Sequence, residues 1–276
     1  LLELVDLGFL PQTLARFESA YTKPYGAILV TGPTGSGKST TLYATLNVLN
    51  KPEVNIITTE DPVEYRLEGI TQVQVNKKAG LTFATALRSI LRSDPDIALV
   101  GEIRDHETAQ IAIEAALTGH LVLSTLHTND APSSIGRLIE MGVEPYLVSS
   151  SLDAVLGQRL ARRLCKKCKV EYSPDKDVLV KARWADEEIE KATASQMYAA
   201  DPKGCGACSN GYRGRLALHE VMLISDEIRR MAVENRPSNE IKVVAKEQGM
   251  LELWDDGMTK VRKGMTSIEE IMRVVA

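Results

Sequence analysis

The nine residues 32–40, GPTGSGKST, place a lysine and hydroxyl side chains among three glycines. The pattern is G-x-x-x-x-G-K-[ST], in which glycines let consecutive backbone N–H groups approach the phosphates of a nucleotide. We expect Lys38 to reach the β- and γ-phosphates of ATP and the Ser39 hydroxyl to bind Mg²⁺. The predicted nucleotide-binding residues are Gly32, Pro33, Thr34, Gly35, Ser36, Gly37, Lys38, Ser39 and Thr40.

Two acidic side chains end apolar runs further along the chain. Glu60 stands in TTEDPVEY, residues 58–65, and Glu102 is the only acid at the end of DIALVGE, residues 96–102. Gly101 stands where many nucleotide hydrolases carry an aspartate that is associated with magnesium. One carboxylate can activate the water that attacks the γ-phosphate, and the other can hold a metal-bound water. We assign the first role to Glu60 and the second to Glu102, with a solvated loop acid as the alternative for Glu60.

Two of the four histidines, His120 and His127, flank the apolar run 121–126. Taken alone, each histidine could simply be solvated or bonded to the backbone. His127 follows the end of a predicted strand, as Glu60 and Glu102 do, so it can face a nucleotide bound at 32–40. We therefore place His127 with the two glutamates as a candidate catalytic residue.

The four cysteines form two C-x-x-C pairs that are separated by 36 residues: Cys165 with Cys168, and Cys205 with Cys208. Two such pairs supply the four thiolates of a tetrahedral structural Zn²⁺ site. The stretch between them is longer than usual, so we expect it to fold back through a helix around WADEEIEKATASQ. Redox pairs or disulfides are the alternative.

Alternating strand and helix patterns surround these motifs. The expected strands are 27–31, 54–60, 96–102 and 120–126, and the expected helices are 37–49, 82–93, 105–118 and 131–141. Strands that are apolar at every position and alternate with helices indicate the α/β class with a parallel sheet. The strand before residue 32 and the helix after it also argue against a chance glycine-rich turn. In the last helix, Thr266 and Glu269 have the spacing of a capping box.

Composition sets the broad class of protein. The chain has 276 residues, of which 44% are hydrophobic and 25% charged, with a formal net charge of −4. This balance is typical of a globular protein and argues against general binding to nucleic-acid backbones, although a local basic patch remains compatible with it. No stretch approaches the ~18 apolar residues that span a bilayer, so we expect at most peripheral membrane association. The chain starts without Met and in mid-pattern, and we interpret it as a C-terminal portion of a longer protein.

Four stretches, in this order, together resemble the Walker A, aspartate, Walker B and histidine boxes of the type II secretion and type IV pilus ATPases: GPTGSGKSTTLYA, TTEDPVEY, LRSDPDIALVGEIRDHETAQ and LTGHLVLSTLHTNDA. The resemblance covers the chain from about residue 25. It implies a RecA-like P-loop core whose histidines, here His120 and His127, lie near the γ-phosphate, and so adds His120 to the candidate catalytic residues. The paired cysteines are similar to those of secretion and pilus-extension ATPases, which favours assembly over retraction.

We expect four segments along the chain. Residues 1–24 would be the end of an upstream region, 25–164 the RecA-like core, 165–214 the zinc-binding insert and 215–276 a C-terminal helical subdomain. The resemblance further implies that an upstream domain supplies arginines to a neighbour's site. Arg88, Arg92 and Arg104 lie close to the boxes but are left unassigned.

The resemblance also implies a function and partners. ATP, Mg²⁺ and Zn²⁺ would be the cofactors of a homo-hexameric motor on the cytoplasmic face of the inner membrane, and a platform protein in that membrane would receive the motion. No direct nucleic-acid contact is expected. A nucleotide-gated docking module with little turnover and a nucleic-acid translocase are the alternatives. The candidate catalytic residues argue against the first, and the acidic charge and the four cysteines against the second.

Overall fold

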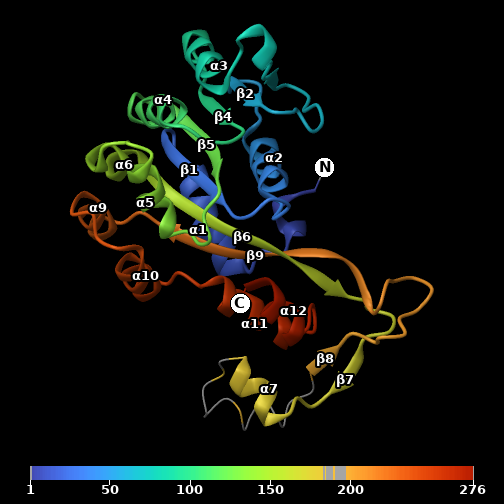
Figure 1. Ribbon diagram of the computed structural model, residues 1–276. Coiled ribbons are helices and arrows are strands. Elements are labelled where there is room, and N and C mark those ends of the chain that lie inside the picture. The colour runs from blue at the N-terminus through green and yellow to red at the C-terminus, as the bar shows by residue number, and fades with distance from the viewer. Residues whose placement is uncertain (1, 183, 185–188, 190–196, 276) are drawn as a thin grey trace. The chain divides into compact units, whose positions relative to one another are not determined.

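Seven strands form one sheet in the order β3-β2-β4-β5-β1-β6-β9 in the computed structural model (Figure 1). The strands are β1 Gly26–Thr31, β2 Ile56–Glu60, β3 Thr71–Gln74, β4 Ile97–Val100, β5 Leu121–Leu126, β6 Leu152–Leu164 and β9 Tyr212–Leu223. Strand β1 pairs in parallel with β5 and β6, β2 with β3 and β4, and β4 with β5. The predicted α/β class with a parallel sheet is confirmed.

The structure describes residues 2–182, 184, 189 and 197–275 and separates into two compact units. Residues 1–158 and 219–251 form the P-loop unit, and residues 159–218 and 252–276 form the cysteine unit. Strands β6 and β9 each run from one unit into the other. This grouping differs from the four expected segments, because β9 returns the chain to the P-loop unit before the last helices.

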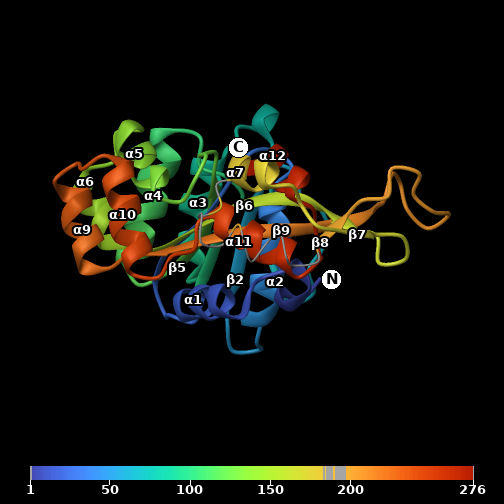
Figure 2. The same ribbon diagram turned by 90° about the horizontal axis from the view of Figure 1, so that it is seen from below.

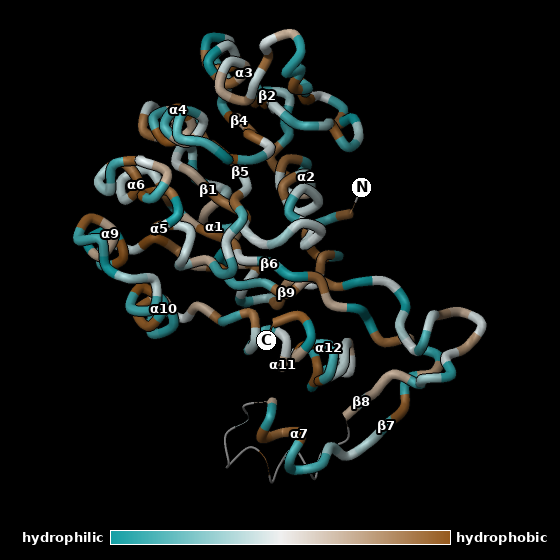
Figure 3. The backbone as a smooth tube through the Cα atoms, viewed as in Figure 1, coloured by the Kyte–Doolittle hydropathy of each residue, from teal (hydrophilic) through white to brown (hydrophobic). Residues whose placement is uncertain are grey.

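Helices cover both faces of the sheet in the P-loop unit (Figure 2). The 3₁₀ helix η1 Leu4–Leu7 and helices α1 Pro11–Tyr21 and α2 Lys38–Leu49 share one apolar cluster with the strands. The opposite cluster joins the strands to α3 Phe83–Ile90, α4 His106–Leu117, α5 Ser133–Glu140, α6 Pro145–Ser151, α9 Asp226–Val233 and α10 Ser238–Glu247. Figure 3 shows both hydrophilic and hydrophobic stretches in α4 and α10, as expected of helices with one face on a core.

Short sequence signals set the ends of these helices. The Asp105 side chain accepts the Thr108 N–H at the start of α4, and Gly119 takes a left-handed φ of 109° just after its end. The helix expected at 82–93 is divided into α3 and the 3₁₀ helix η3 Leu91–Ser93. A further 3₁₀ helix, η2, spans Lys77–Ala79.

The cysteine unit has a smaller apolar core of its own. Its elements are the antiparallel pair β7 Val170–Tyr172 and β8 Met197–Ala199, with helices α7 Lys176–Lys181, α11 Leu253–Arg262 and α12 Ile268–Val275. The helix expected around WADEEIEKATASQ lies outside the described residues, apart from Trp184 and Ile189. In the described part of the chain, every helix is too short or too polar to cross a membrane.

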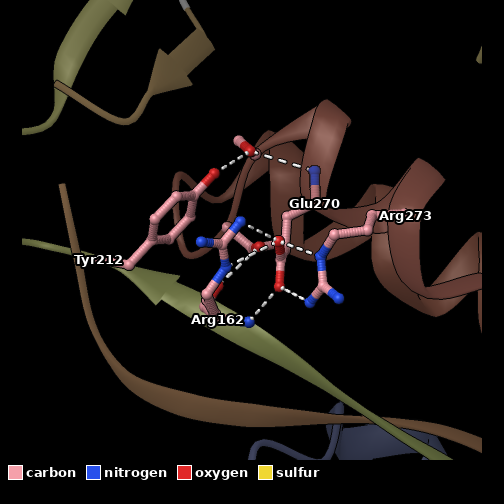
Figure 4. A network of polar contacts seen from close by, with 6 residues as sticks. Arg162, Tyr212, Glu270 and Arg273 are labelled. Atoms are coloured by element: carbon pink, nitrogen blue, oxygen red, sulfur yellow. Dashed lines mark hydrogen bonds and ion pairs between the residues drawn. The ribbon is translucent and has the colours of Figure 1, made fainter. Parts of the chain in front are cut away.

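A buried acid joins α12 to the two long strands within the cysteine unit (Figure 4). Glu270 accepts hydrogen bonds from the Arg162 and Arg273 guanidinium groups, and the Arg162 guanidinium lies 4.0 Å from the centroid of the Tyr212 ring. Burial acts to raise the pKa of Glu270, but the bonds from Arg273 and Arg162 outweigh it and hold this pKa at about 2. Glu270 therefore stays ionised at neutral pH.

The capping box expected at Thr266 and Glu269 is wrong: within the described residues a single N-cap at Ser267 starts α12. The Thr266 hydroxyl donates to the Arg162 carbonyl oxygen at 2.9 Å. Ser267 Oγ instead accepts the Glu270 N–H at 3.3 Å and so serves as the N-cap of α12. The difference arises from tertiary contacts, because the Thr266 hydroxyl and the Glu270 carboxylate both form hydrogen bonds with Arg162 of strand β6.

Candidate functional site

The segment 32–40 forms a tight loop between β1 and α2. Gly32 has a φ of 149°, and a Cβ atom placed there would lie 2.4 Å from the Gln158 carbonyl oxygen. Gly37, with a φ of 88°, precedes Lys38 at the first turn of α2. Only glycine suits these two positions, and the loop directs the amino end of α2 toward the space where phosphates would bind.

Lys38 and Gln158 fix the shape of this loop. The buried Lys38 donates through Nζ to the carbonyl oxygens of Gly32 at 2.9 Å and Pro33 at 3.1 Å. Gln158 Nε2 donates to the Ser36 carbonyl oxygen at 2.8 Å, and its Oε1 accepts the Thr41 hydroxyl at 2.8 Å. Gln158 lies on β6 and was missed in the sequence analysis, because no local motif marks a residue whose partners, Ser36 and Thr41, lie 122 and 117 positions away.

Three predicted residues lie at the same edge of the sheet as this loop. Val100 aligns with Thr59 on β2 and with Ser124 on β5, and Thr31 aligns with Leu126. The strands β2, β4, β5 and β1 are therefore consecutive in the sheet, with their carboxyl ends at one edge. Glu60, Glu102 and His127 lie at that edge, where the loop 32–40 also begins. The Thr128 N–H donates to Thr31 Oγ1 at 2.9 Å, which joins the end of β5 directly to the start of the loop.

Glu102 is part of a charged cluster. Its Oε2 atom lies 2.6 Å from Arg104 Nε and 3.6 Å from His127 Nε2. The Glu102 side chain is 15% exposed and the His127 side chain 43% exposed, so both can reach a bound ligand. The contact with Arg104 was not anticipated from sequence, whereas Arg88 forms a surface ion pair with Glu107 at 2.5 Å.

Glu60 has different surroundings, because its side chain is buried among hydroxyl and amide groups. It accepts hydrogen bonds from the Tyr43 hydroxyl, from Thr58 Oγ1 at 2.5 Å and from Gln72 Nε2 at 3.1 Å. Nearby, a Cβ atom on Gly101 would lie 3.2 Å from the Thr59 carbonyl oxygen and 3.3 Å from Glu60 Cα. An aspartate at position 101 would therefore displace the end of β2.

Within one chain, His120 is not brought to the edge of the sheet where Glu60, Glu102 and His127 lie. It precedes β5, and its carbonyl oxygen accepts the Gly26 N–H at 3.1 Å, at the start of β1. Its ring Nδ1 lies 3.0 Å from the Ala115 carbonyl oxygen. A parallel pair of six-residue strands, about 20 Å long, separates His120 from the loop at 32–40. The histidines lie at opposite ends of β5.

The four cysteines form the second candidate site. Their sulfur atoms all lie within 4.8 Å of one another, with 3.8 Å between Cys165 and Cys205 and 3.5 Å between Cys168 and Cys208. Sulfurs that bind one tetrahedral zinc at about 2.3 Å are separated by about 3.8 Å, whereas a disulfide needs about 2 Å. All four thiols are free. The geometry fits a shared metal ion and not the alternative of disulfides.

The backbone around Cys165 favours the thiolate form of this residue. The backbone N–H of Lys167 stabilises its thiolate and lowers the pKa of the Cys165 thiol to about 7. Metal binding requires the deprotonated thiolate, so this group loses its proton readily near neutral pH.

Comparisons with known proteins agree with this geometry. The family model described as Type II/IV secretion system protein matches residues 1–273. Over 271 residues the chain is 52% identical to the type IV pilus assembly ATPase PilB of Thermus thermophilus. Over 275 residues it is 50% identical to the type II secretion system protein E of Klebsiella pneumoniae.

These relatives are much longer than this chain. The two matches cover 98% and 99% of the chain, but only 30% of the first relative and 53% of the second. A crystal structure of the pilus retraction motor PilT with bound ADP matches with a TM-score of 0.72 and 28% sequence identity. That match covers 99% of this chain and 66% of the other.

Proposed function

Because the chain belongs to the type II/IV secretion system protein family, we propose that it is the ATP-hydrolysing part of a motor for type IV pilus assembly or type II protein secretion. One observation carries the proposal. The glycine loop that can hold phosphates and the side chains of Glu60, Glu102 and His127 all lie at the carboxyl edge of one parallel sheet.

In the proposed reaction, residues 32–40 bind the phosphates of ATP. The backbone N–H groups of the loop and the Lys38 ammonium supply the positive charge, and Ser39 at the start of α2 offers its hydroxyl to Mg²⁺. When bound, Mg²⁺ neutralises charge on the phosphates. Gln158 keeps the loop in its shape through the hydrogen bonds to Ser36 and Thr41.

Hydrolysis forms a bond between a water oxygen and the γ-phosphorus and breaks the bond from that phosphorus to the β–γ bridging oxygen. We assign Glu60 to receive the proton of this water and Glu102 to orient the water shell of the magnesium ion. We also propose that His127, whose Nε2 atom lies 3.6 Å from Glu102 Oε2, responds to the loss of the γ-phosphate. The products are ADP, inorganic phosphate and the proton that Glu60 receives.

Zn²⁺ is the metal we propose for Cys165, Cys168, Cys205 and Cys208, with a structural role. Each C-x-x-C pair would contribute two thiolates, and all four ligand positions would be filled by protein. A site closed in this way has no open position for a reacting molecule, so it stabilises the chain without taking part in hydrolysis.

The assembly and partners are also proposals. We place the full protein in a homo-hexamer on the cytoplasmic face of the inner membrane, with a platform protein of that membrane as its partner and no direct nucleic-acid contact. The support is the 50% and 52% identity to proteins named for type II secretion and type IV pilus assembly. Light scattering of the full-length protein with a non-hydrolysable ATP analogue tests the six-membered ring.

The central test is ATP turnover by the full-length protein, with Lys38→Ala as the inactive variant and Lys51→Ala as a control. Lys51 is an exposed lysine just beyond α2, so its removal leaves the phosphate loop intact. We expect Mg²⁺-dependent phosphate release that falls at least about 10²-fold in Lys38→Ala alone. Tight ATP binding without turnover in the assembled protein would instead indicate a nucleotide-gated docking module.

A further inference from the structure

We infer that Tyr43 and Gln72 are positioning residues that hold the Glu60 carboxylate in place for hydrolysis. The inference rests on the proposed function, because it concerns how Glu60 performs its part. A carboxylate removed from water keeps a fixed orientation only where protein donors replace the lost water. Around Glu60 these donors come from α2 and β3 as well as from its own strand.

Both oxygens of Glu60 are held. Oε2 accepts from the Tyr43 hydroxyl, and Oε1 accepts from Thr58 Oγ1 and from Gln72 Nε2. The register explains why they meet, because Thr58 pairs with Gln72 across the parallel strands β2 and β3. Glu60 follows two residues after Thr58, so the side chains of both point to the same face of β2. Glu60 itself is only 4% exposed.

Tyr43 is oriented to donate and not to accept at Glu60. Its hydroxyl oxygen accepts the Glu64 N–H at 3.3 Å, which leaves its own proton for the Glu60 carboxylate. Burial raises the pKa of Tyr43 far above its ordinary value, and the bond to Glu60 raises it further, so the hydroxyl keeps this proton. Tyr43 lies on α2, the helix that starts at Lys38. It therefore connects the phosphate loop to Glu60.

Gln72 connects Glu60 to the segment 61–70 that precedes its own strand. Its Nε2 atom also lies 3.2 Å from the Tyr65 carbonyl oxygen, and its Oε1 atom accepts the Leu67 N–H at 2.7 Å. These bonds hold the amide group of Gln72 with its NH₂ toward Glu60. Gln72, which does not contact the phosphate loop in the described part of the chain, thus sets where Oε1 of Glu60 lies.

The test measures kcat and KM for ATP in the full-length protein. Gln72→Glu keeps the size of the side chain but replaces the donor with a second carboxylate, and Tyr43→Phe removes only a hydroxyl. We expect each variant to lower kcat by about tenfold or more, the scale of a lost hydrogen bond to a charged group. KM for ATP should change less than about twofold, because residues 32–40 are untouched.

Thr71→Glu is the control. Thr71 is an exposed residue of β3 that pairs with Ile57 and lies on the opposite face from Gln72, so this variant adds the same charge to the strand without directing it at Glu60. This variant should keep the wild-type kcat. A general structural defect would change stability and KM in all three variants. Loss of Glu60 positioning would instead lower kcat in Gln72→Glu and Tyr43→Phe and leave the control unchanged.

The same changes in a Glu60→Gln background decide whether they act through Glu60. Less than about a twofold further loss of kcat supports the inference, since the group being positioned is already gone. A full additional tenfold loss overturns it, and so does an unchanged kcat in Gln72→Glu and Tyr43→Phe while Glu60→Gln is impaired. Normal turnover in Glu60→Gln overturns the role proposed for Glu60 itself, and the inference with it.

Discussion

The two candidate sites of this chain are built in opposite ways. The nucleotide site collects residues from β1, β2, β4, β5 and β6, whose positions are fixed by a sheet with an apolar cluster on each face. The cysteine site needs only two short C-x-x-C turns, in a unit with one smaller core. The comparison indicates that the first site is held by the fold and that the second helps to hold the fold.

The two units that carry these sites also have net charges of opposite sign. The sequence of the P-loop unit carries 24 acidic against 16 basic side chains, and that of the cysteine unit 13 against 17. Under the proposed function the acidic unit binds an anionic nucleotide, so local groups such as Lys38, the loop N–H groups and Mg²⁺ would have to outweigh its net charge. Four thiolates on the proposed Zn²⁺ would carry a net negative charge, which the basic charge of the cysteine unit would partly offset.

Loss of the proposed metal should have the largest effect on stability, and this effect should be confined to the cysteine unit. Cys205→Ser, or zinc removal by a chelator, should expose backbone amides of the cysteine unit to hydrogen exchange while those of β1 and α2 stay protected. Ser209→Ala, an exposed change nearby, is the control. The wild-type protein should hold about one zinc per chain. Absence of zinc, with four rapidly titratable thiols in the native state, would refute the metal site.

The carboxylates should give the next largest effect. Glu60→Gln should lower ATP turnover by about 10² or more, about 2.7 kcal/mol, with ATP and Mg²⁺ affinity nearly intact. Glu102→Gln should also weaken the dependence on Mg²⁺, because a charge that orients the metal's water is lost. Turnover against Mg²⁺ concentration in the full-length protein distinguishes them. Near-normal turnover in Glu60→Gln would move the role of base to Glu102.

Glu270 should give a smaller, pH-dependent effect confined to the cysteine unit. Its pKa is about 2 in the folded chain against an ordinary 4.5, so its stabilisation is present above pH 4.5 and is lost as pH falls toward 2. With both arginines about half exposed to solvent, we expect about 2 kcal/mol at neutral pH. Glu270→Gln should lose this pH dependence in chemical unfolding. The exposed Glu269→Gln should retain it, and equal behaviour of the two variants would contradict the assignment.

The smallest effect should come from His120. His120→Ala removes a side chain at the amino edge of the sheet, so turnover should change by less than about twofold, whereas His127→Ala should lower it by tenfold or more. Measured in the full-length protein, a large loss in His120→Ala would show that His120 acts on the nucleotide despite its distance from the loop at 32–40 within one chain.

Sequence was sufficient wherever a function depends on neighbours along the chain. The spacing of Gly32, Gly37 and Lys38 predicted the phosphate loop, because these residues are neighbours along the chain. The sulfur cluster was predicted because each C-x-x-C pair is local and the motif occurs twice. Apolar runs that alternate with helical patterns likewise predicted the parallel sheet, because burial on both faces leaves a direct mark on composition.

Tertiary structure decided what depends on strand ends and on partners from distant elements. His120 and His127 look alike in sequence, but a strand has two ends and only the carboxyl end of β5 lies beside the phosphate loop. Glu60 and Glu102 also look alike, yet Tyr43 and Gln72 surround the first while Arg104 and His127 face the second. The physical reason is that hydrogen-bond donors and burial act through space, over a few ångströms, and packing alone determines which residues come that close.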